Sequence, residues 1–359
     1  MTGAIAAGTL ATGSAQATTS ATSASSTAAA VSDKGTHLVL LGTAGGPPPF
    51  ADRMGISSAL VVNGKTYVID CGRGAVTQFV RAGLDMRSLS GIFLTHLHAD
   101  HTVDYFAFPL LCGGVFQPFT GFSKVLDVYG PGSPGELHSI SGKSWFNPSN
   151  PFPGTAGLTR LAAEAWAYST NAFTAEGIGV PPSDLLNVHE IALPDTGATV
   201  TDTAPSMSPF TVMENDEMKV TAILVPHGAV FPAFAYRFET PDGSVVFSGD
   251  TAPTANIPVL AKHASVLVHE VIDTTWFQEQ GLPAPIVTHM QDVHTPVSEI
   301  GRIGAESGAR KMVLTHFSPG DPQARSEQWW ARQARVGKKA AGYRGEIVVG
   351  RDLLRMRVR

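Results

Sequence analysis

The sequence predicts an α/β fold in which two similar layers pack sheet against sheet, with helices on the outside. Short apolar, β-branched runs typical of strands alternate with helical patterns, and both halves of the chain repeat this order. Several of the strands end in polar residues. The length of 359 residues, with 43% hydrophobic and 15% charged residues, is that of a globular chain with a large core.

The predicted elements follow one another as apolar runs separated by turn residues, of which Asn63-Gly64 is a strong hairpin signal. In the first half we expect strands at 36–43, 57–62, 66–70, 91–95 and 123–129, and helices at 74–83 and 105–112. In the second half we expect strands at 218–225, 233–240, 244–251, 265–271 and 311–315, helices at 257–263, 296–308 and 326–341, and closing strands within 345–358.

Two segments depart from this alternation. Residues 1–35 are almost wholly Ala, Ser, Thr and Gly, so we expect a disordered leader before a single domain at 36–359. An apolar stretch followed by Ala-Gln-Ala resembles an export signal without its basic start, which favours a periplasmic or secreted protein over a cytoplasmic one. Residues 130–195, rich in Pro, Ser, Gly and aromatics around a helical run at 158–173, read as an insertion or lid.

Composition excludes several classes of protein. The net charge of −5 gives no general attraction to nucleic acid, and no apolar run is long enough to span a membrane. Cys71 and Cys112 are the only cysteines, too few for a thiolate zinc site or a disulfide framework, and we expect both to be buried free thiols.

The segment THLHADH holds four metal-type residues: His96, His98, Asp100 and His101. It follows the apolar run 91–94, and residues at i and i+2 of an extended segment share a face. Imidazole and carboxylate are ligands that Zn²⁺ accepts, and four donors on one turn suggest two adjacent ions. Chance is a weak explanation for this segment because the chain has only twelve histidines, and the remaining alternative is a solvated polar loop after a strand.

Three further strand ends carry such residues: His227 in VPHGA, Asp250 in SGDT and His316 in VLTHF. Singly, each has a structural alternative, namely a loop histidine, a turn or helix cap, and a histidine at a strand end. Together with THLHADH they supply seven ligands, enough for two sites of three ligands each and one bridging carboxylate.

These motifs, in this order, resemble those of the metallo-β-lactamase superfamily over about residues 36–358. LGTAGGP, YVIDCGRG, FLTHLHADH, SVVFSGDT, LVHEV and HTPVSEIGRIG are similar to the ribonuclease Z-like and arylsulfatase-like members. The resemblance implies a four-layer αβ/βα sandwich that binds two Zn²⁺ per chain. It assigns His96, His98 and His227 to one ion, Asp100, His101 and His316 to the other, and Asp250 to both. His98 stands where the oxygen-reducing members carry glutamate, which favours hydrolysis.

The implied chemistry is hydrolysis by a hydroxide that two cations share, because paired cations lower the pKa of water and clamp the attacked oxygens. Asp100, His294 and Glu270 are the candidate catalytic residues. By the resemblance, His294 is the general acid that protonates the leaving group, and Glu270 orients it. The alternative is that His294 caps the helix that follows it and Glu270 lies on the surface.

The charge pattern favours a small-molecule ester over tRNA as substrate. Residues 130–195 hold two basic and six acidic residues, whereas gripping RNA needs several Lys and Arg. The aromatics of this insertion suit an apolar pocket, or else pack it onto the body: Trp145, Phe146, Phe152, Trp166, Tyr168 and Phe173. Residues 331–359 carry nine Lys and Arg against two acidic residues, so they form a solvated face or bind RNA.

The favoured function is therefore a dinuclear zinc hydrolase of an aryl sulfate, phosphodiester, carboxylic ester or lactone. The alternative is a ribonuclease Z-type tRNA 3′-processing endonuclease. A binding module without activity is disfavoured because no ligand is missing. No membrane partner is expected, and a homodimer is left open.

Overall fold

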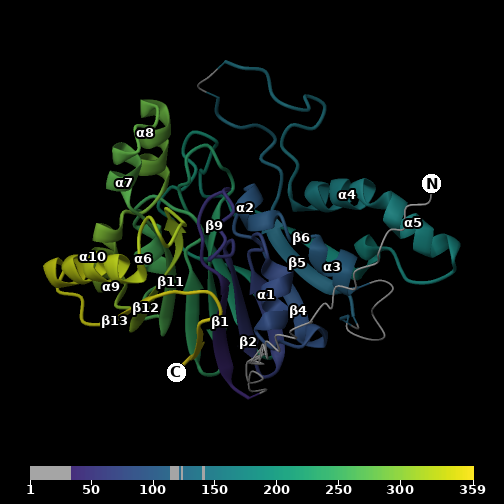
Figure 1. Cartoon of the computed structure of the whole chain (residues 1–359), viewed down its shortest axis with the longest axis horizontal. Helices are drawn as coiled ribbons and strands as arrows, with labels where there is room; N and C mark the ends of the chain where they lie inside the picture. Colours follow the sequence, from purple (N-terminus) through teal and green to yellow (C-terminus); the bar gives the residue numbers. More distant parts are fainter. Residues whose placement is uncertain (1–33, 114–120, 123, 140–141) are drawn as a thin grey trace, which may run out of the picture.

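Two seven-stranded sheets pack face to face in the computed structural model, which describes residues 34–113, 121–122, 124–139 and 142–359 (Figure 1). In spatial order, the first sheet contains β14 (Arg355–Arg357), β1 (Thr36–Gly42), β2 (Ser57–Val62), β3 (Lys65–Ile69), β4 (Leu89–Phe93), β5 (Leu126–Pro131) and β6 (Leu186–Ile191). The second contains β13 (Glu346–Val349), β12 (Lys311–Ser318), β11 (Val266–Ile272), β10 (Gly243–Phe247), β9 (Phe234–Thr240), β8 (Lys219–Leu224) and β7 (Phe210–Glu214).

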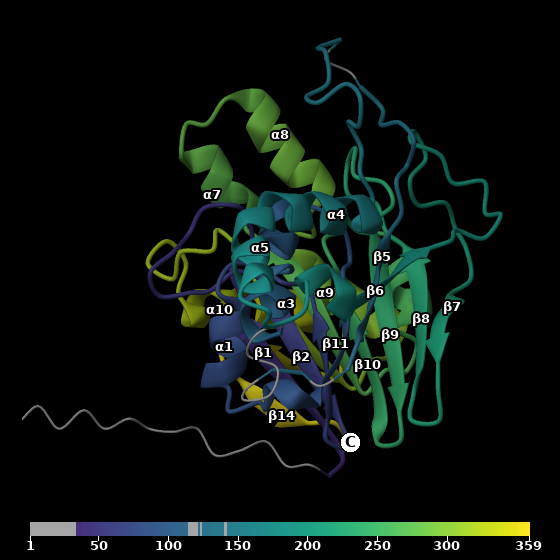
Figure 2. The same cartoon turned by 90° about the vertical axis from the view of Figure 1, so that its right-hand side faces the viewer.

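Helices cover the outer face of each sheet (Figure 2). On the first sheet and its insertion they are α1 (Ala75–Arg81), α2 (Ala99–Thr102), α3 (Ala107–Cys112), α4 (Thr155–Ala165) and α5 (Ala167–Ala175), with the 3₁₀ turns η1 (Met86–Ser88) and η3 (Pro182–Leu185). On the second they are α6 (Asn256–Leu260), α9 (Ile300–Ser307) and α10 (Glu327–Ala340), with the 3₁₀ turn η4 (Val297–Glu299), whereas α7 (Thr274–Glu279) and α8 (Ala284–Val293) protrude from one end of the molecule.

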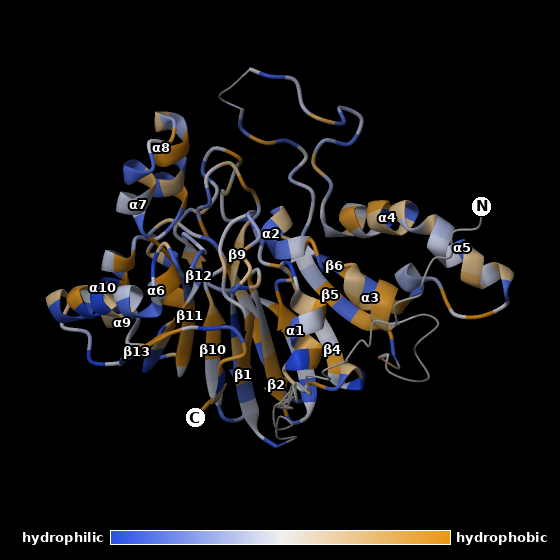
Figure 3. Cartoon of the chain, in the orientation of Figure 1, coloured by the Kyte–Doolittle hydropathy of each residue, from blue (hydrophilic) through white to orange (hydrophobic). Residues whose placement is uncertain are grey.

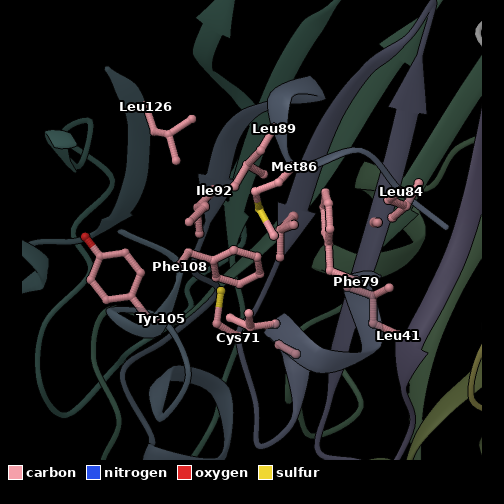
Figure 4. Close-up of a cluster of buried hydrophobic side chains, with 14 of the residues drawn as sticks. Leu41, Cys71, Phe79, Leu84, Met86, Leu89, Ile92, Tyr105, Phe108 and Leu126 are labelled. Carbon is pink, nitrogen blue, oxygen red and sulfur yellow. The ribbon is translucent and has the colours of Figure 1, made fainter. Parts of the chain in front are cut away.

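Three buried clusters separate these layers. The middle cluster joins residues of both sheets, such as Leu40 and Phe238, so it is the core between the sheets. One outer cluster packs α1, α3 and α4 on the first sheet, with Phe79 and Phe108 in edge-to-face contact (Figure 4). The other packs α6, α9 and α10 on the second sheet, around the buried Trp330. Figure 3 shows the apolar colouring concentrated in the strands. The predicted four-layer αβ/βα sandwich is confirmed.

The parallel parts of the two sheets decide where a site can form. In the first sheet β3, β4, β5 and β6 run parallel, and in the second β10, β11, β12 and β13 do. The carboxyl ends of parallel strands meet at one edge of a sheet. Because the sheets face each other, polar residues that follow β3, β4, β10, β11 and β12 come together at one edge of the sandwich.

The structure agrees with most predicted elements and corrects several. The helix predicted at 158–173 is two helices, α4 and α5, because Trp166 leaves the helical conformation with φ −101° and ψ 12°. The insertion predicted at 130–195 is narrower, since β6 belongs to the first sheet. β6 and β7 are half-exposed edge strands, so they lack the apolar run that marks the others. The helices α7 and α8 were not predicted.

Some predictions concern residues at the margins of the described structure. The leader at 1–33 and the start of the strand expected at 123–129 lie outside the described residues. Both cysteines are free thiols as expected, with Cys71 buried and Cys112 only half-buried. Within the described part of the chain, no helix combines the length and apolar character that a membrane span requires.

Candidate metal centre and active site

The THLHADH segment changes from extended to helical backbone among its metal-type residues. β4 ends at Phe93, and the chain is still extended at His98, the N-cap of α2, with φ −63° and ψ 150°. His96 is buried and His98 exposed, and their ring centroids lie 4.8 Å apart. Asp100 and His101 lie in the single turn of α2. One strand-to-helix connection thus positions four candidate ligands.

Three other strand ends supply the remaining candidates. His227 follows β8, Asp250 follows β10, and His316 lies near the end of β12. The turn before Asp250 requires glycine: Gly249 has φ +58°, and a Cβ there would lie 2.7 Å from the carbonyl oxygen of Phe234. His316 has φ +46°, a left-handed conformation that non-glycine residues rarely adopt outside constrained sites.

The seven predicted ligands converge into two groups, within each of which the candidate ligand atoms lie within 4.8 Å of one another. One group is His96, His98 and His227, and the other is Asp100, His101, Asp250 and His316. The grouping is the one that the sequence resemblance implies, with Asp250 in the second group.

Asp250 lies between the two groups. Its Oδ2 atom is 4.0 Å from Nε2 of His96 and 3.8 Å from Nε2 of His227, both in the first group. The same oxygen is 3.2 Å from Nε2 of His316, and Oδ1 is 3.3 Å from Nε2 of His101, both in the second group. One buried carboxylate therefore faces histidines of both groups, as a bridging ligand must.

Several of these atoms are buried without a hydrogen-bond partner among the described residues: Nε2 of His96, Nε2 of His101 and Oδ1 of Asp250. A buried polar atom left unpaired costs about 1–3 kcal/mol. Cations bound in the two groups would give all three atoms a partner, and imidazole nitrogen with carboxylate oxygen is a donor set that Zn²⁺ accepts. The residues present therefore fit the divalent cations predicted from the sequence.

The outer nitrogens of the ligand histidines are held by neighbouring groups. Nδ1 of His101 donates to Oδ2 of Asp70 at 2.9 Å, and Nδ1 of His227 donates to the carbonyl oxygen of Val293 at 3.0 Å. Asp70 also accepts from the backbone N–H of Thr95, which ties the end of β3 to the histidine turn. These bonds direct each Nε2 inward. Sequence reasoning missed Asp70, although it stands in the quoted motif YVIDCGRG directly after a buried strand.

Burial and charge set the protonation of the ligands. Burial lowers the pKa of His96 well below its ordinary value, and lowers that of His227 to about 3, which keeps both rings neutral. Burial also opposes the charged form of His101, but the nearby carboxylates, led by Asp250 and Asp70, outweigh it and raise its pKa well above the ordinary value. A cation at this site would therefore displace a proton from His101.

His294 and Glu270 form a buried pair beside both groups. His294 is the C-cap of α8, and its Nδ1 lies 2.9 Å from Oε2 of Glu270 on β11. Its ring centroid is 5.1 Å from that of His227 and 5.7 Å from that of His316. Burial lowers the pKa of His294, but the Glu270 carboxylate outweighs it and raises the pKa to about 9. Glu270 is 1% exposed, so the alternative that it is a surface residue is wrong.

Two cavities are lined by different residues of the loop 228–232, which follows His227. The cavity at His98, which we call the apolar cavity, has a volume of about 270 Å³. The other, which we call the α8 cavity, measures about 700 Å³ and is lined by His289 and Asp292 of α8. Among the described residues, no Lys or Arg lines either cavity. In Figures 1 and 2 the segment between β5 and α4 and the pair α7–α8 protrude from the same end of the molecule.

The aromatics of the insertion separate into two sets. Phe152 lines the apolar cavity. The ring of Trp145 packs edge-on against the ring of Phe152, with the two centroids 4.8 Å apart. Phe146 and Tyr168 are 95% and 90% exposed, and Trp166 is half exposed. Of these aromatics, Phe152 alone is among the lining residues of the two cavities, so the expected aromatic pocket holds for Phe152 with Trp145 behind it, whereas Phe146, Tyr168 and Trp166 are largely exposed.

Two families match parts of the sequence. The family described as "Beta-lactamase superfamily domain" matches residues 170–317, which include β8 to β12. The family described as "Anti-Pycsar protein Apyc1" matches residues 36–108, which include the histidine turn. The matches together cover the segments that supply all seven candidate ligands.

Similar proteins extend over most of the chain. "Ribonuclease Z" of Mycobacterium bovis is 27% identical over 322 residues, covering 90% of this chain and 98% of its own length. The human tRNase Z short form has a TM-score of 0.58 at 17% identity, with 90% and 99% of the two chains covered. The metallo-β-lactamase fold protein YhfI from Bacillus subtilis has a TM-score of 0.56 at 16% identity, with 89% and 98% covered. The chain has the metallo-β-lactamase fold, and over 90% of its length it is similar to ribonuclease Z, a hydrolase of that superfamily.

Proposed function

We propose that the chain is a metal-dependent phosphodiesterase of the ribonuclease Z kind, which removes 3′ trailers from precursor tRNA. The observation that carries this is the convergence of seven metal-type side chains around Asp250, with the His294–Glu270 pair beside them. The named relatives support RNA as the substrate. The small-molecule ester that the sequence favoured receives no support from them.

In this proposal the two groups would each hold one Zn²⁺. His96, His98 and His227 would hold one ion, Asp100, His101 and His316 would hold the other, and Asp250 would serve both. When bound, the two cations would activate water as the nucleophile and stabilise negative charge on the attacked phosphoryl group. The buried atoms without partners and the neutral imidazoles support this assignment.

The protein's own contribution is to hold a proton for the leaving group. His294 keeps its Nδ1 proton in the bond to Glu270, so its Nε2 proton is the one available for the leaving oxygen. Because the pKa of His294 is raised to about 9, the imidazole is protonated at neutral pH. Glu270 is a positioning residue, since its carboxylate fixes the ring and favours the charged form.

A second candidate is a small phosphodiester, and one observation favours it. No Lys or Arg among the described residues lines the two cavities beside the centre, and residues 130–195 hold two basic against six acidic residues. A polymer with one charge per nucleotide needs cations along its path. The basic residues of α10, which include Arg335 and Lys338, line a different cavity.

The test compares substrates with zinc-loaded protein. A precursor tRNA with a 3′ trailer, bis(p-nitrophenyl) phosphate, an aryl sulfate, an aryl acetate and a lactone are assayed, with Asp250→Ala as the control for contaminating activity. We expect both phosphodiesters to react with higher kcat/KM than the other esters, and the trailer to be released. tRNA binding should weaken steeply with salt. Hydrolysis of the small phosphodiester alone would select the second candidate, and turnover of only the sulfate, acetate or lactone would overturn the proposal.

A further inference from the structure

We propose that the apolar cavity binds a planar aromatic ring carried by the group that remains on phosphorus after cleavage. The ring is a nucleobase or an aryl group, which present the same flat apolar face. The inference rests on phosphodiester hydrolysis at the metal centre, and it holds for either candidate substrate.

The position of the cavity relates it to the scissile bond. One wall is His98, the exposed candidate ligand, together with the neighbouring Leu97. A second wall is the loop that follows His227, with Phe231 and Pro232. A group bound in this cavity would lie next to the candidate metal ligands, so it could belong to the same ester whose phosphorus is attacked at the metal centre.

The insertion supplies the remaining wall. Beside Pro131 at the end of β5, its lining residues are mostly proline and apolar side chains: Gly132, Pro134, Leu137, Pro151, Phe152, Pro153 and Leu158. Proline fixes the backbone dihedral φ, so this wall is stiffer than an ordinary loop and needs less ordering on binding. Phe152 is further supported by Trp145, with the ring planes at 82°. Aromatic rings pack favourably against such a surface.

The lining chemistry identifies the occupant. No Asp, Glu, Lys or Arg lines the cavity, so it offers no charged partner to a phosphate or to a cationic group. The volume of about 270 Å³ suits one ring system rather than an extended chain. An apolar, proline-stiffened space beside a metal ligand therefore selects an uncharged flat group.

The general acid decides which side of the ester the ring occupies. His294 must lie beside the leaving oxygen, and it is not among the lining residues of the apolar cavity. The α8 cavity includes Val293, the residue before His294, and Gly228, and it shares no lining residue with the apolar cavity. The leaving group therefore belongs to the His294 side, and the retained group belongs to the apolar cavity.

The first experiment keeps the leaving group constant and varies the retained group. Zinc-loaded protein is assayed with p-nitrophenyl phosphodiesters whose second ester group is methyl, cyclohexyl, phenyl or thymidin-5′-yl. We expect kcat/KM to be about tenfold higher for the phenyl and thymidinyl esters than for the methyl ester, because stacking of one ring typically increases affinity by about this factor. The cyclohexyl ester should fall below the phenyl ester because it is not planar. The ratio of thymidinyl to phenyl shows whether a nucleobase or a simple aryl group is the better occupant.

Variants locate the effect. Leu158→Trp fills the cavity and Phe152→Ala removes its aromatic wall, so each should bring the phenyl-to-methyl ratio close to one. Phe146→Ala is the matched control, because it removes a 95% exposed ring of the same segment that does not line the cavity. It should keep the ratio of the unmodified protein. Thermal unfolding of each variant separates loss of the cavity from loss of the fold.

A binding measurement without turnover completes the test. Phenylphosphonate should bind about tenfold more tightly than methylphosphonate and change the tryptophan fluorescence, and the change should be absent in Trp145→Phe. Equal hydrolysis of all four esters, with Leu158→Trp unaltered, would overturn the aromatic subsite while leaving the phosphodiesterase intact. Failure to hydrolyse even the methyl ester would instead overturn the proposed function.

Discussion

Nδ1 of His294 lies 2.9 Å from Oε2 of Glu270, and the two side chains are 6% and 1% exposed. The pair joins the C-cap residue of α8 to a strand of the second sheet, 24 residues apart in sequence. A buried carboxylate on one ring nitrogen orients the other nitrogen and favours the charged imidazole. This pair and the metal groups give rise to four predictions.

His294→Ala should keep its metal but lower kcat by about 10²–10⁴-fold, the usual contribution of a positioned general acid. The loss should be largest for phosphodiesters with a poor, alkoxide-like leaving group and smallest for p-nitrophenolate, which needs little protonation. Steady-state kinetics over a leaving-group series and elemental analysis of the same preparation measure both effects. An equal loss for all leaving groups would contradict the role of proton donor.

Glu270→Gln should move the alkaline limb of the pH–rate profile to lower pH by about 1–3 units. His294 must be protonated to act, so activity is lost as the pH rises through its pKa. The Glu270 carboxylate raises that pKa to about 9, and the neutral amide no longer does so. Asp127→Asn, which changes an exposed carboxylate paired with His189, is the control and should leave the limb in place. If the alkaline limb of the Glu270→Gln variant is unchanged, the limb does not report the titration of His294.

Asp250→Ala should lose metal and activity together, because the Asp250 carboxylate faces both ligand groups. Elemental analysis should find about two zinc equivalents in the unmodified protein, following the seven-ligand grouping, and fewer than one in the variant. His227→Ala, which removes a ligand of the first group only, should lose less metal than Asp250→Ala. Full activity in Asp250→Ala would show that Asp250 does not bridge.

Asp70→Asn should weaken metal binding by about 10–100-fold, the usual effect of losing the partner that orients a ligand histidine. The Asp70 carboxylate accepts from Nδ1 of His101 at 2.9 Å and from the backbone N–H of Thr95, and a carboxylate partner makes Nε2 a more basic ligand than an amide does. Competition with a chelator measures the affinity. If the metal affinity is unaltered and thermal unfolding shows an intact fold, Asp70 only ties the end of β3 to the histidine turn and does not support the metal ligand.

Local sequence determined much of this protein. Apolar runs bounded by turn residues fixed most strands and helices, because strand and helix periodicity is written in neighbouring residues. The i, i+2 spacing of His96 and His98, followed by a helix start, already predicted a ligand-bearing turn. The four polar strand ends predicted the ligand set, since parallel strands end at a common edge.

Only the tertiary structure brought distant segments together. Nε2 of His227 lies 3.2 Å from Nδ1 of His98, across 129 residues, because the two sheets face each other at the edge where β4 and β8 end. Strand periodicity does not encode which sheet edges meet, so the roles of Asp70 and the burial of Glu270 became visible only in the folded chain. β6 likewise became visible only in the folded chain, because a half-exposed edge strand has no continuous apolar run. The apolar cavity also depends on the tertiary structure, since it forms where Phe152 of the insertion meets the loop after His227.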